Sequence, residues 1–108
     1  MALEGALVFV ETVDEADQFR TWLGQRRSVL AIDLETTGLE WWKDRIRLAI
    51  VSDEDTSYVI PWERWSGVLY ETLPNYTRPT VFHNAKFDLH FLDAAGLALD
   101  WRNVHDTA

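Results

Sequence analysis

Residues 29–39 read VLAIDLETTGL, and this stretch decides the fold. Positions 29–34 are apolar on both alternating sets except at Asp33. That pattern is typical of a central strand covered on both faces of a sheet. The strand is predicted to end at two acids, Asp33 and Glu35, before a Thr-Thr-Gly turn. We therefore place residues 29–34 in the middle of the sheet.

Strand and helix signals extend outward from this stretch in both directions. Thr12 and Glu15 have the spacing of a capping box, which predicts a helix from about Val13. The acidic connection SDEDT at 52–56 is short and favours an antiparallel hairpin, which the central strand joins as a meander. In chain order the predicted elements are a strand at 7–10, the helix from 13, strands at 29–34, 46–51 and 58–60, a helix at 62–73, a strand at 80–83, a helix at 85–95 closed by Gly96, and a short strand near 104.

Length, charge and composition limit the kinds of protein this can be. A chain of 108 residues fits one small domain, and a net charge of −8 argues against nucleic-acid binding by a broad basic surface. The absence of Cys excludes thiolate zinc sites and leaves carboxylates and His as catalytic groups. No stretch approaches the ~18 apolar residues of a membrane helix, and the start of the chain has no basic leader. We therefore expect a soluble, cytoplasmic protein with no membrane partner.

Asp33 and Glu35 form the first candidate site. Because they are two positions apart on a strand, their side chains leave the same face about 6 to 7 Å apart. Two negative charges at that separation repel by roughly 2 to 3 kcal/mol at an effective dielectric of 20, and a divalent cation would reverse the sign. Hard oxygen ligands favour Mg²⁺ or Mn²⁺ and suggest phosphoryl chemistry. The alternative is a strand that ends in two solvated acids, and the pair alone does not decide.

Asp88 is the residue that favours the metal interpretation. On the helix predicted at 85–95 it shares a face with the apolar residues three, four and seven positions later. A buried, unpaired carboxylate is costly or becomes protonated, so it needs a partner. The alternative to a metal shared with Asp33 is a salt bridge to Lys86 or to an Arg. Lys86 is only two positions away and faces elsewhere on the helix.

Two stretches carry a resemblance to a known family. AIDLETTGL at 31–39 is similar to the first motif of the DEDD 3′-5′ exonucleases, a DnaQ-like and ribonuclease H-like group, and VFHNAKFDLHFL at 81–92 is similar to the second. The segments IRLAIVS, SYVIP and HDTA also resemble the exonuclease domain of family A DNA polymerases, so that the similarity covers nearly the whole chain. The resemblance implies an α/β fold: a ribonuclease H-like mixed sheet of about five strands, an antiparallel meander plus parallel strands, flanked by helices.

The resemblance also implies a function and a set of site residues. It implies a proofreading 3′-5′ exonuclease that releases nucleoside 5′-monophosphates from the 3′ end of single-stranded DNA. Two divalent cations, Mg²⁺ or Mn²⁺, would flank the scissile phosphate, one to activate water and one to stabilise the departing 3′ oxygen. The residues implied in catalysis and metal binding are Asp33, Glu35 and Asp88, and those implied in substrate binding are Thr36, Thr37, Leu39 and Asn84.

The third motif of the family, a Tyr or His followed four residues later by the last Asp, has no counterpart in this sequence. We therefore interpret residues 1–108 as a partial, C-terminally truncated exonuclease domain from a parent chain of the DNA polymerase I type. Asp106 matches a separate Asp-Thr pair of the family and is assigned no catalytic role. For these residues alone we expect weak Mn²⁺ binding and little cleavage, because one cation loses a ligand.

Two other functions are compatible with the same residues. A ribonuclease D-like RNA exonuclease uses the same carboxylates on the same fold, and a comparison of single-stranded DNA with RNA would separate the two. The other is a non-catalytic module of the same fold that binds a nucleic acid or a protein partner. The presence of all three carboxylates argues against such a module.

The His and Trp residues receive weaker interpretations. His83, His90 and His105 lack metal-ligand spacing, and we expect structural roles for them. Trp22, Trp62 and Trp65 are expected to pack in the core. Trp41 and Trp42 are open to either packing or base stacking.

Lys43, Arg45 and Arg47 alternate just beyond the candidate site. They are as compatible with a solvated strand face as with contacts to a phosphate backbone. The sequence does not decide between the two.

Overall fold

The structure is a computed structural model that describes residues 6–25 and 29–107. The predicted domain range of 1–108 extends beyond these residues at both ends. The strands are β1 (Ala6–Phe9), β2 (Leu30–Thr36), β3 (Ile46–Ser52), β4 (Thr56–Pro61), β5 (Thr80–Phe82) and β6 (Val104–Asp106). The helices are α1 (Val13–Gly24), α2 (Trp62–Trp65), α3 (Gly67–Thr72) and α4 (Ala85–Ala94), with 3₁₀ turns η1 (Leu73–Asn75) and η2 (Trp101–Asn103). No helix in this described part is long and apolar enough to cross a membrane.

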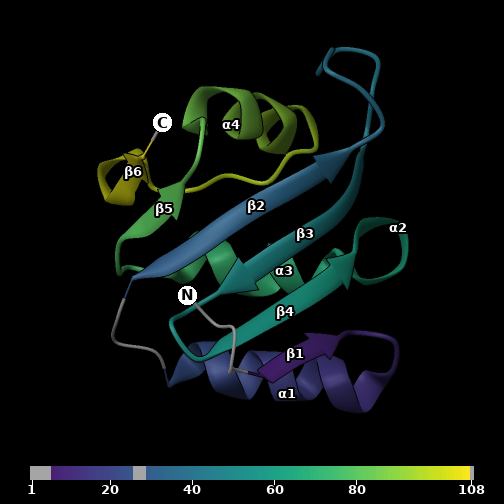
Figure 1. Cartoon of the computed structure of the whole chain (residues 1–108), viewed down its shortest axis with the longest axis vertical. Coiled ribbons are helices and arrows are strands. Elements are labelled where there is room, and N and C mark those ends of the chain that lie inside the picture. The colour runs from purple at the N-terminus through teal and green to yellow at the C-terminus, as the bar shows by residue number, and fades with distance from the viewer. Residues whose placement is uncertain (1–5, 26–28, 108) are drawn as a thin grey trace.

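The strands form one mixed sheet in the order β1-β4-β3-β2-β5-β6 (Figure 1). β2, β3 and β4 are paired as the antiparallel meander that the sequence predicts. β1 is added in parallel to β4, and β5 and β6 are added in parallel on the other side of β2. The sheet therefore has six strands where about five were expected, and β2 lies inside it as predicted.

The ends of several elements follow from local sequence. Asp53 makes the β3–β4 turn, because its Oδ1 accepts from the backbone N–H groups of Asp55 and Thr56, both at 2.8 Å. Gly96 ends α4 with a φ of 81°, as expected for a left-handed helix terminus. The helix predicted at 62–73 is wrong as a single element: it is α2 and α3, followed by η1. Gly67, a poor helix former, lies at the junction of the two short helices.

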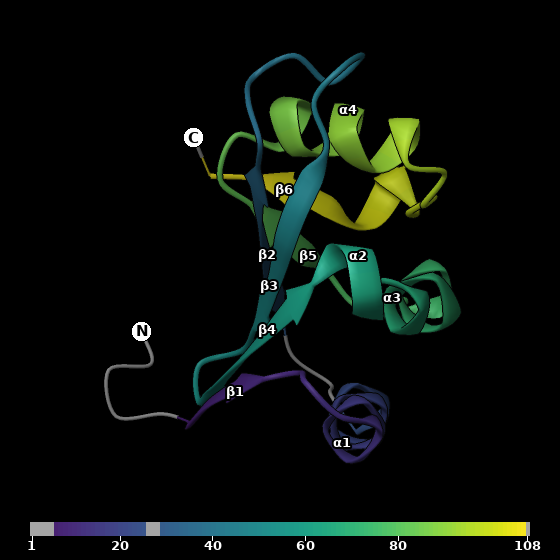
Figure 2. The same cartoon turned by 90° about the vertical axis from the view of Figure 1, so that its right-hand side faces the viewer.

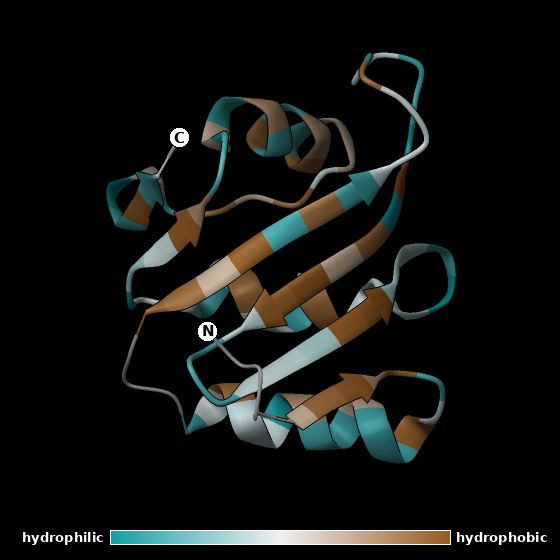
Figure 3. Cartoon of the chain, viewed as in Figure 1, coloured by the Kyte–Doolittle hydropathy of each residue, from teal (hydrophilic) through white to brown (hydrophobic). Residues whose placement is uncertain are grey.

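Among residues 6–25 and 29–107, the helices lie on one side of the sheet and leave its other face uncovered (Figure 2). Leu30, Ile32 and Leu34 of β2 are buried, whereas the alternate positions, including Asp33 and Glu35, are exposed. Figure 3 shows the resulting bands of hydrophobic and hydrophilic residues along β2. The prediction that this strand is covered on both faces is therefore wrong within the described residues. The apolar residue at an exposed position of β2 is Ala31, whose side chain is small and costs little to expose to water.

Aromatic packing attaches α1 to the sheet. The rings of Phe19 and Tyr58 meet edge to face with centroids 5.2 Å apart, and the rings of Trp22 and Tyr58 lie 4.8 Å apart. Tyr58 lies opposite Val51, which in turn lies opposite Ile32. All of these except Trp22 are buried, so one row of core side chains runs from β4 through β3 to β2. The position of β2 therefore depends on packing that begins at α1.

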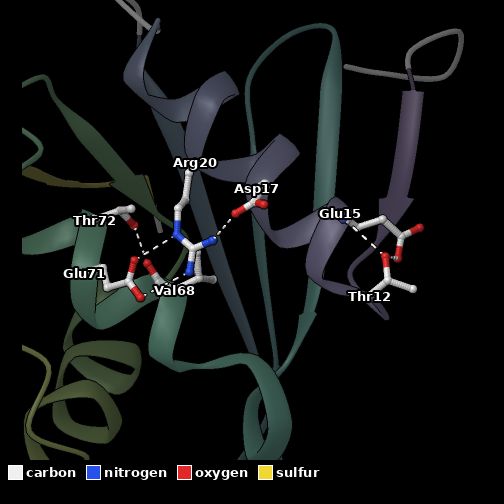
Figure 4. A network of polar contacts seen from close by, with 7 residues as sticks. All are labelled: Thr12, Glu15, Asp17, Arg20, Val68, Glu71 and Thr72. Atoms are coloured by element: carbon white, nitrogen blue, oxygen red, sulfur yellow. Dashed lines mark hydrogen bonds and ion pairs between the residues drawn. The ribbon is translucent and has the colours of Figure 1, made fainter.

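Polar contacts set the start and the direction of α1 (Figure 4). The predicted N-cap is present in the structure: the Glu15 N–H donates to the Thr12 hydroxyl at 3.3 Å, while the Glu15 carboxylate accepts from the N–H of Glu11 at 2.8 Å. Farther along the helix, the Arg20 guanidinium donates to both carboxylate oxygens of Glu71 on α3, at 2.8 and 3.1 Å. Asp17 also pairs with Arg20. These groups are partly exposed, so their contribution to stability is modest.

Replacing Phe19 with Ala is expected to lower the free energy of unfolding by about 3 to 5 kcal/mol, because it leaves a cavity in a buried aromatic cluster. Urea denaturation followed by circular dichroism measures the loss. Gln18→Ala changes an exposed neighbour on the same helix and should stay within about 0.5 kcal/mol of the parent chain. Equal effects of the two substitutions would contradict the packing described here.

Candidate active site

The predicted carboxylate pair lies where β2 extends past its parallel neighbour. β5 pairs with β2 only as far as Ile32, which is opposite Phe82. Asp33 is therefore the first residue beyond that pairing, and Asp33 and Glu35 are both exposed on the open face. The β2–β3 ladder is irregular directly after Glu35. The two carboxylates thus share one face of the strand, as their spacing predicts.

A tight turn leads from β5 into α4. Asn84 has φ 69° and ψ 61°, in the left-handed region that Asn adopts more readily than most residues. Its backbone N–H donates to Oδ1 of Asp106, at the end of β6, over 3.0 Å. The backbone N–H of Thr107 donates to the carbonyl of Phe82 over 2.9 Å. The end of β6 therefore holds the turn from which α4 starts.

Asp88 lies in the first turn of α4 and is 3% exposed. Its Oδ2 is buried without a hydrogen-bond partner among the described residues. Burial raises the pKa of this carboxyl from 3.8 to about 7, and the charges of Asp33 and Asp106 add to the rise. Within the described part of the chain Asp88 forms no ion pair, so the proposed salt bridge to Lys86 or an Arg is not present.

A divalent cation fits this set of groups. All the ligand atoms on offer are carboxylate oxygens, which suit Mg²⁺ and Mn²⁺. A cation would provide the missing partner of Asp88 Oδ2 and offset its repulsion with Asp33. In residues 6–25 and 29–107, no three acidic or His side chains lie close enough to form a ready-made metal site. The fold thus makes Asp33 and Asp88 electrostatic neighbours, while Glu35 lies two residues farther along β2 on the same face.

The residues predicted to bind substrate fall into two groups. The Thr36 hydroxyl donates to a backbone carbonyl two residues on at 2.7 Å, and the Thr37 hydroxyl accepts from the N–H of Arg45 at 3.1 Å. Both hydroxyls therefore shape the loop after β2. Leu39 is 80% exposed, and Asn84 is exposed at the start of α4. These two side chains are accessible to a ligand.

Asp106 is the site residue that sequence reasoning missed. It was assigned no catalytic role, and the structure gives it a positioning role through the N–H of Asn84. Its charge also contributes to the raised pKa of Asp88. One sequence signal could have identified it: Asp106 and Thr107 follow the last predicted strand, and that strand lies parallel to β5. Carboxyl ends of parallel neighbours meet at one edge of the sheet.

Two of the His residues have structural contacts, in agreement with the expectation from sequence. The Nδ1 of His83 lies 3.5 Å from the hydroxyl of Thr107. The ring of His90 stacks on the indole of Trp41. His105 is exposed on β6. None of the three belongs to a cluster of metal-ligating side chains in the part of the chain that the structure describes.

Comparison with known proteins agrees with this arrangement. The sequence model of the 3′-5′ exonuclease family matches residues 9–108. The chain belongs to this family and is a 3′-5′ exonuclease domain. It is 33% identical over 106 residues to the DNA polymerase of Mycobacterium phage L5, and 30% identical over 117 residues to that of Mycobacterium phage D29. These matches cover 91% and 97% of this chain but only 18% and 19% of the two polymerases.

Solved structures show the same fold. The catalytic core of RRP6 from Trypanosoma brucei superposes with a TM-score of 0.79 at 23% identity, over 99% of this chain and 30% of that one. NrnC of Brucella melitensis with bound Mg²⁺ gives 0.64 at 25% identity, over 99% and 50%. Trypanosoma brucei RNase D in complex with RNA U12 gives 0.72 at 18% identity, over 96% and 38%. The ribonuclease H-like fold expected from the sequence is therefore confirmed.

Replacing Asp88 with Asn tests the buried charge through the pH dependence of stability. The folded carboxyl has a pKa of about 7 and the unfolded one a pKa near 3.8, so the folded state holds the proton longer. The parent chain should lose stability as the pH rises from about 4 to about 7, because the unfolded state ionises first. Between about pH 5 and pH 8 the free energy of unfolding of the parent chain should fall by roughly 2 to 3 kcal/mol more than that of Asp88→Asn.

Urea denaturation in EDTA at several pH values measures this difference. Asp93→Asn, an exposed change on the same helix, should follow the parent profile. At pH 8, Mn²⁺ should stabilise the parent chain more than Asp88→Asn, since a ligand that binds the folded state raises its stability. Parallel pH profiles for the parent and Asp88→Asn would contradict the assigned environment.

Proposed function

We propose that this domain provides the metal-binding and 3′-end-binding part of a proofreading exonuclease that acts on single-stranded DNA. The reaction is hydrolysis of the terminal phosphodiester, with release of a nucleoside 5′-monophosphate. The observation that carries the proposal is the buried, unpaired Asp88 carboxylate beside Asp33 in a member of the exonuclease family. Similarity to two phage DNA polymerases favours DNA as the substrate and a polymerase as the remainder of the parent chain.

Each carboxylate has a distinct part in this proposal. Asp33 and Glu35 offer oxygens from the open face of β2, where a phosphate can approach from solvent. Asp88 offers a buried oxygen from α4, which limits where a shared cation can lie. Two Mg²⁺ or Mn²⁺ ions held by these groups would supply Lewis-acid stabilisation of the attacking and leaving oxygens. The solved NrnC with Mg²⁺ supports this choice of ion.

The groups at the end of β2 and the start of α4 bind the substrate in this proposal. Leu39 projects into solvent from the loop that follows the carboxylates, where it can contact the terminal base. Asn84, held by Asp106, lies exposed at the start of the helix that carries Asp88. The hydroxyls of Thr36 and Thr37 and the Thr37 N–H are engaged within the loop, so Leu39 and Asn84 are the side chains proposed to contact the substrate.

An RNA substrate is the second candidate. Trypanosoma brucei RNase D was solved with RNA U12, and it shares the fold of this chain. Its 18% identity supports the fold alone, whereas the phage polymerases are more similar in sequence. A side-by-side assay on single-stranded DNA and RNA of the same sequence separates the two substrates.

Metal binding by the chain itself is the first test. Titration calorimetry with Mn²⁺ should give weak binding, and Asp33→Ala should abolish it because a ligand and a negative charge are removed. Asp14→Ala, an exposed acid on α1, removes the same charge elsewhere and should bind as the parent does. Equal binding by Asp33→Ala and the parent chain would refute the metal site.

The second test is activity in a polypeptide that continues through the third motif of the family. It should shorten 5′-labelled single-stranded DNA in Mg²⁺ or Mn²⁺, and Asp33→Ala should slow this by more than ~100-fold. Even outer-shell partners of a metal contribute about 10- to 100-fold, so a direct ligand should contribute more. Intact DNA binding without any cleavage would instead identify the non-catalytic module.

A further inference from the structure

The loop that joins β2 to β3 is held in one shape by its own polar contacts. The Thr37 N–H donates to the Arg45 carbonyl at 2.9 Å, and the Arg45 N–H donates back to the Thr37 hydroxyl at 3.1 Å. The Asp44 carboxylate accepts from the N–H of Glu40 at 2.9 Å. Asp44 also lies so close to Gly38 that a Cβ at that glycine would overlap its carboxylate. The loop is therefore shaped before any ligand binds, which lowers the entropy cost of binding.

This loop presents an aromatic pair beside α4. The Trp41 ring stacks on the imidazole of His90, with centroids 5.1 Å apart and planes 10° from parallel. Trp42 meets Trp41 edge to face at 5.7 Å and 89°. Trp42 is 65% exposed. Its ring is thus open to solvent while its neighbour is fixed to a helix, and the core-packing interpretation does not apply to it.

Cations line the groove that leads away from this pair. A hollow of about 430 Å³ is lined by Trp42 and Arg45, and another of about 940 Å³ by Arg45, Arg47 and Arg64. Arg45 lines both hollows. Neither Arg45 nor Arg47 forms an ion pair within the residues that the structure describes. In a chain of net charge −8, this is a local surface suited to phosphate.

We propose that Trp42 is a base-stacking platform for a nucleotide upstream of the 3′ terminus, and that Arg45 and Arg47 contact the adjoining phosphates. The inference rests on the proposed function and adds a binding subsite to it. The loop begins directly after the part of β2 that carries Asp33 and Glu35 (Figure 1), so a strand end held at the carboxylates passes beside it. Stacking suits an enzyme that must accept any sequence, because every base has a π-face.

The charge of the groove favours a nucleic acid over a protein partner. Protein interfaces are depleted of charge at their cores, whereas unpaired arginines beside an exposed indole match a phosphate backbone with its bases. Asp44 also lines the first hollow, but its carboxylate is engaged by the loop backbone. Glu63 lines the second hollow beside Arg45, Arg47 and Arg64, so the positive groups outnumber the one acid there.

Fluorescence anisotropy with a short 5′-fluorescein oligothymidine in EDTA and low salt tests the subsite without cleavage. Trp42→Ala should raise the Kd between about 5-fold and about 150-fold, the range expected for one stacked base, and Trp42→Phe should restore most of it. Phe9→Ala, an exposed aromatic change at the far edge of the sheet, should leave the Kd unchanged. Arg47→Ala should lower the slope of log Kd against log salt concentration by about 1, whereas Arg78→Ala, in a different hollow lined by residues of α1 and α3, should not.

Oligonucleotides with one abasic position identify the stacked base. For the parent chain, removing the base at one position should raise the Kd about as much as Trp42→Ala does. For Trp42→Ala, removing the base at that position should raise the Kd no further. An unchanged Kd for Trp42→Ala, or losses that add at every position, would overturn the subsite. If Mn²⁺ binding persists in that case, the proposed function stands without it. If the oligonucleotide binds as expected and Mn²⁺ does not, the proposed function fails and the subsite stands.

Discussion

The two-residue period of β2 is the constraint on which the site depends. Ile32 and Leu34 must face the helices, so Asp33 and Glu35 must face the other way. A shift of one residue would bury both acids and expose the core. The row of packed side chains from α1 through β4 and β3 holds β2 in this register. The same register of β2 is therefore required both for a stable core and for exposed carboxylates.

Asp88 is the point where packing and function conflict. The fold places its carboxylate on the apolar stripe of α4, where burial and the charge of Asp33 both oppose ionisation. An apolar residue would suit the core better, and in the proposed function a bound cation accounts for this energetic cost. Under that proposal cation binding and stability are coupled, because the ion binds the folded arrangement and not the unfolded chain. Asp106 supports the arrangement by holding the turn before α4.

The loop after β2 carries the aromatic residue of the proposed base-stacking subsite. Its shape comes from short-range hydrogen bonds and from one glycine pressed against Asp44. Its attachment to α4 comes from the stack of Trp41 on His90. β2 and α4, which carry the carboxylates, are therefore also connected through this loop. In the proposed function, a DNA strand end at the carboxylates meets the exposed Leu39 and the exposed ring of Trp42 on the loop that follows them.

The sequence by itself determined most of the local elements and singled out the three carboxylates of the proposed site. Periodicity, the N-cap and the hairpin turn depend on residues a few positions apart, and so they could be predicted. The split of the helix at Gly67 was missed because weak local preferences compete with packing. Only the tertiary structure decided that one face of β2 is uncovered within the described residues, that the Asp106 carboxylate binds the Asn84 N–H, and that Trp41 stacks on His90. The physical reason is that each depends on distances through space between segments far apart in the chain, which no local pattern specifies.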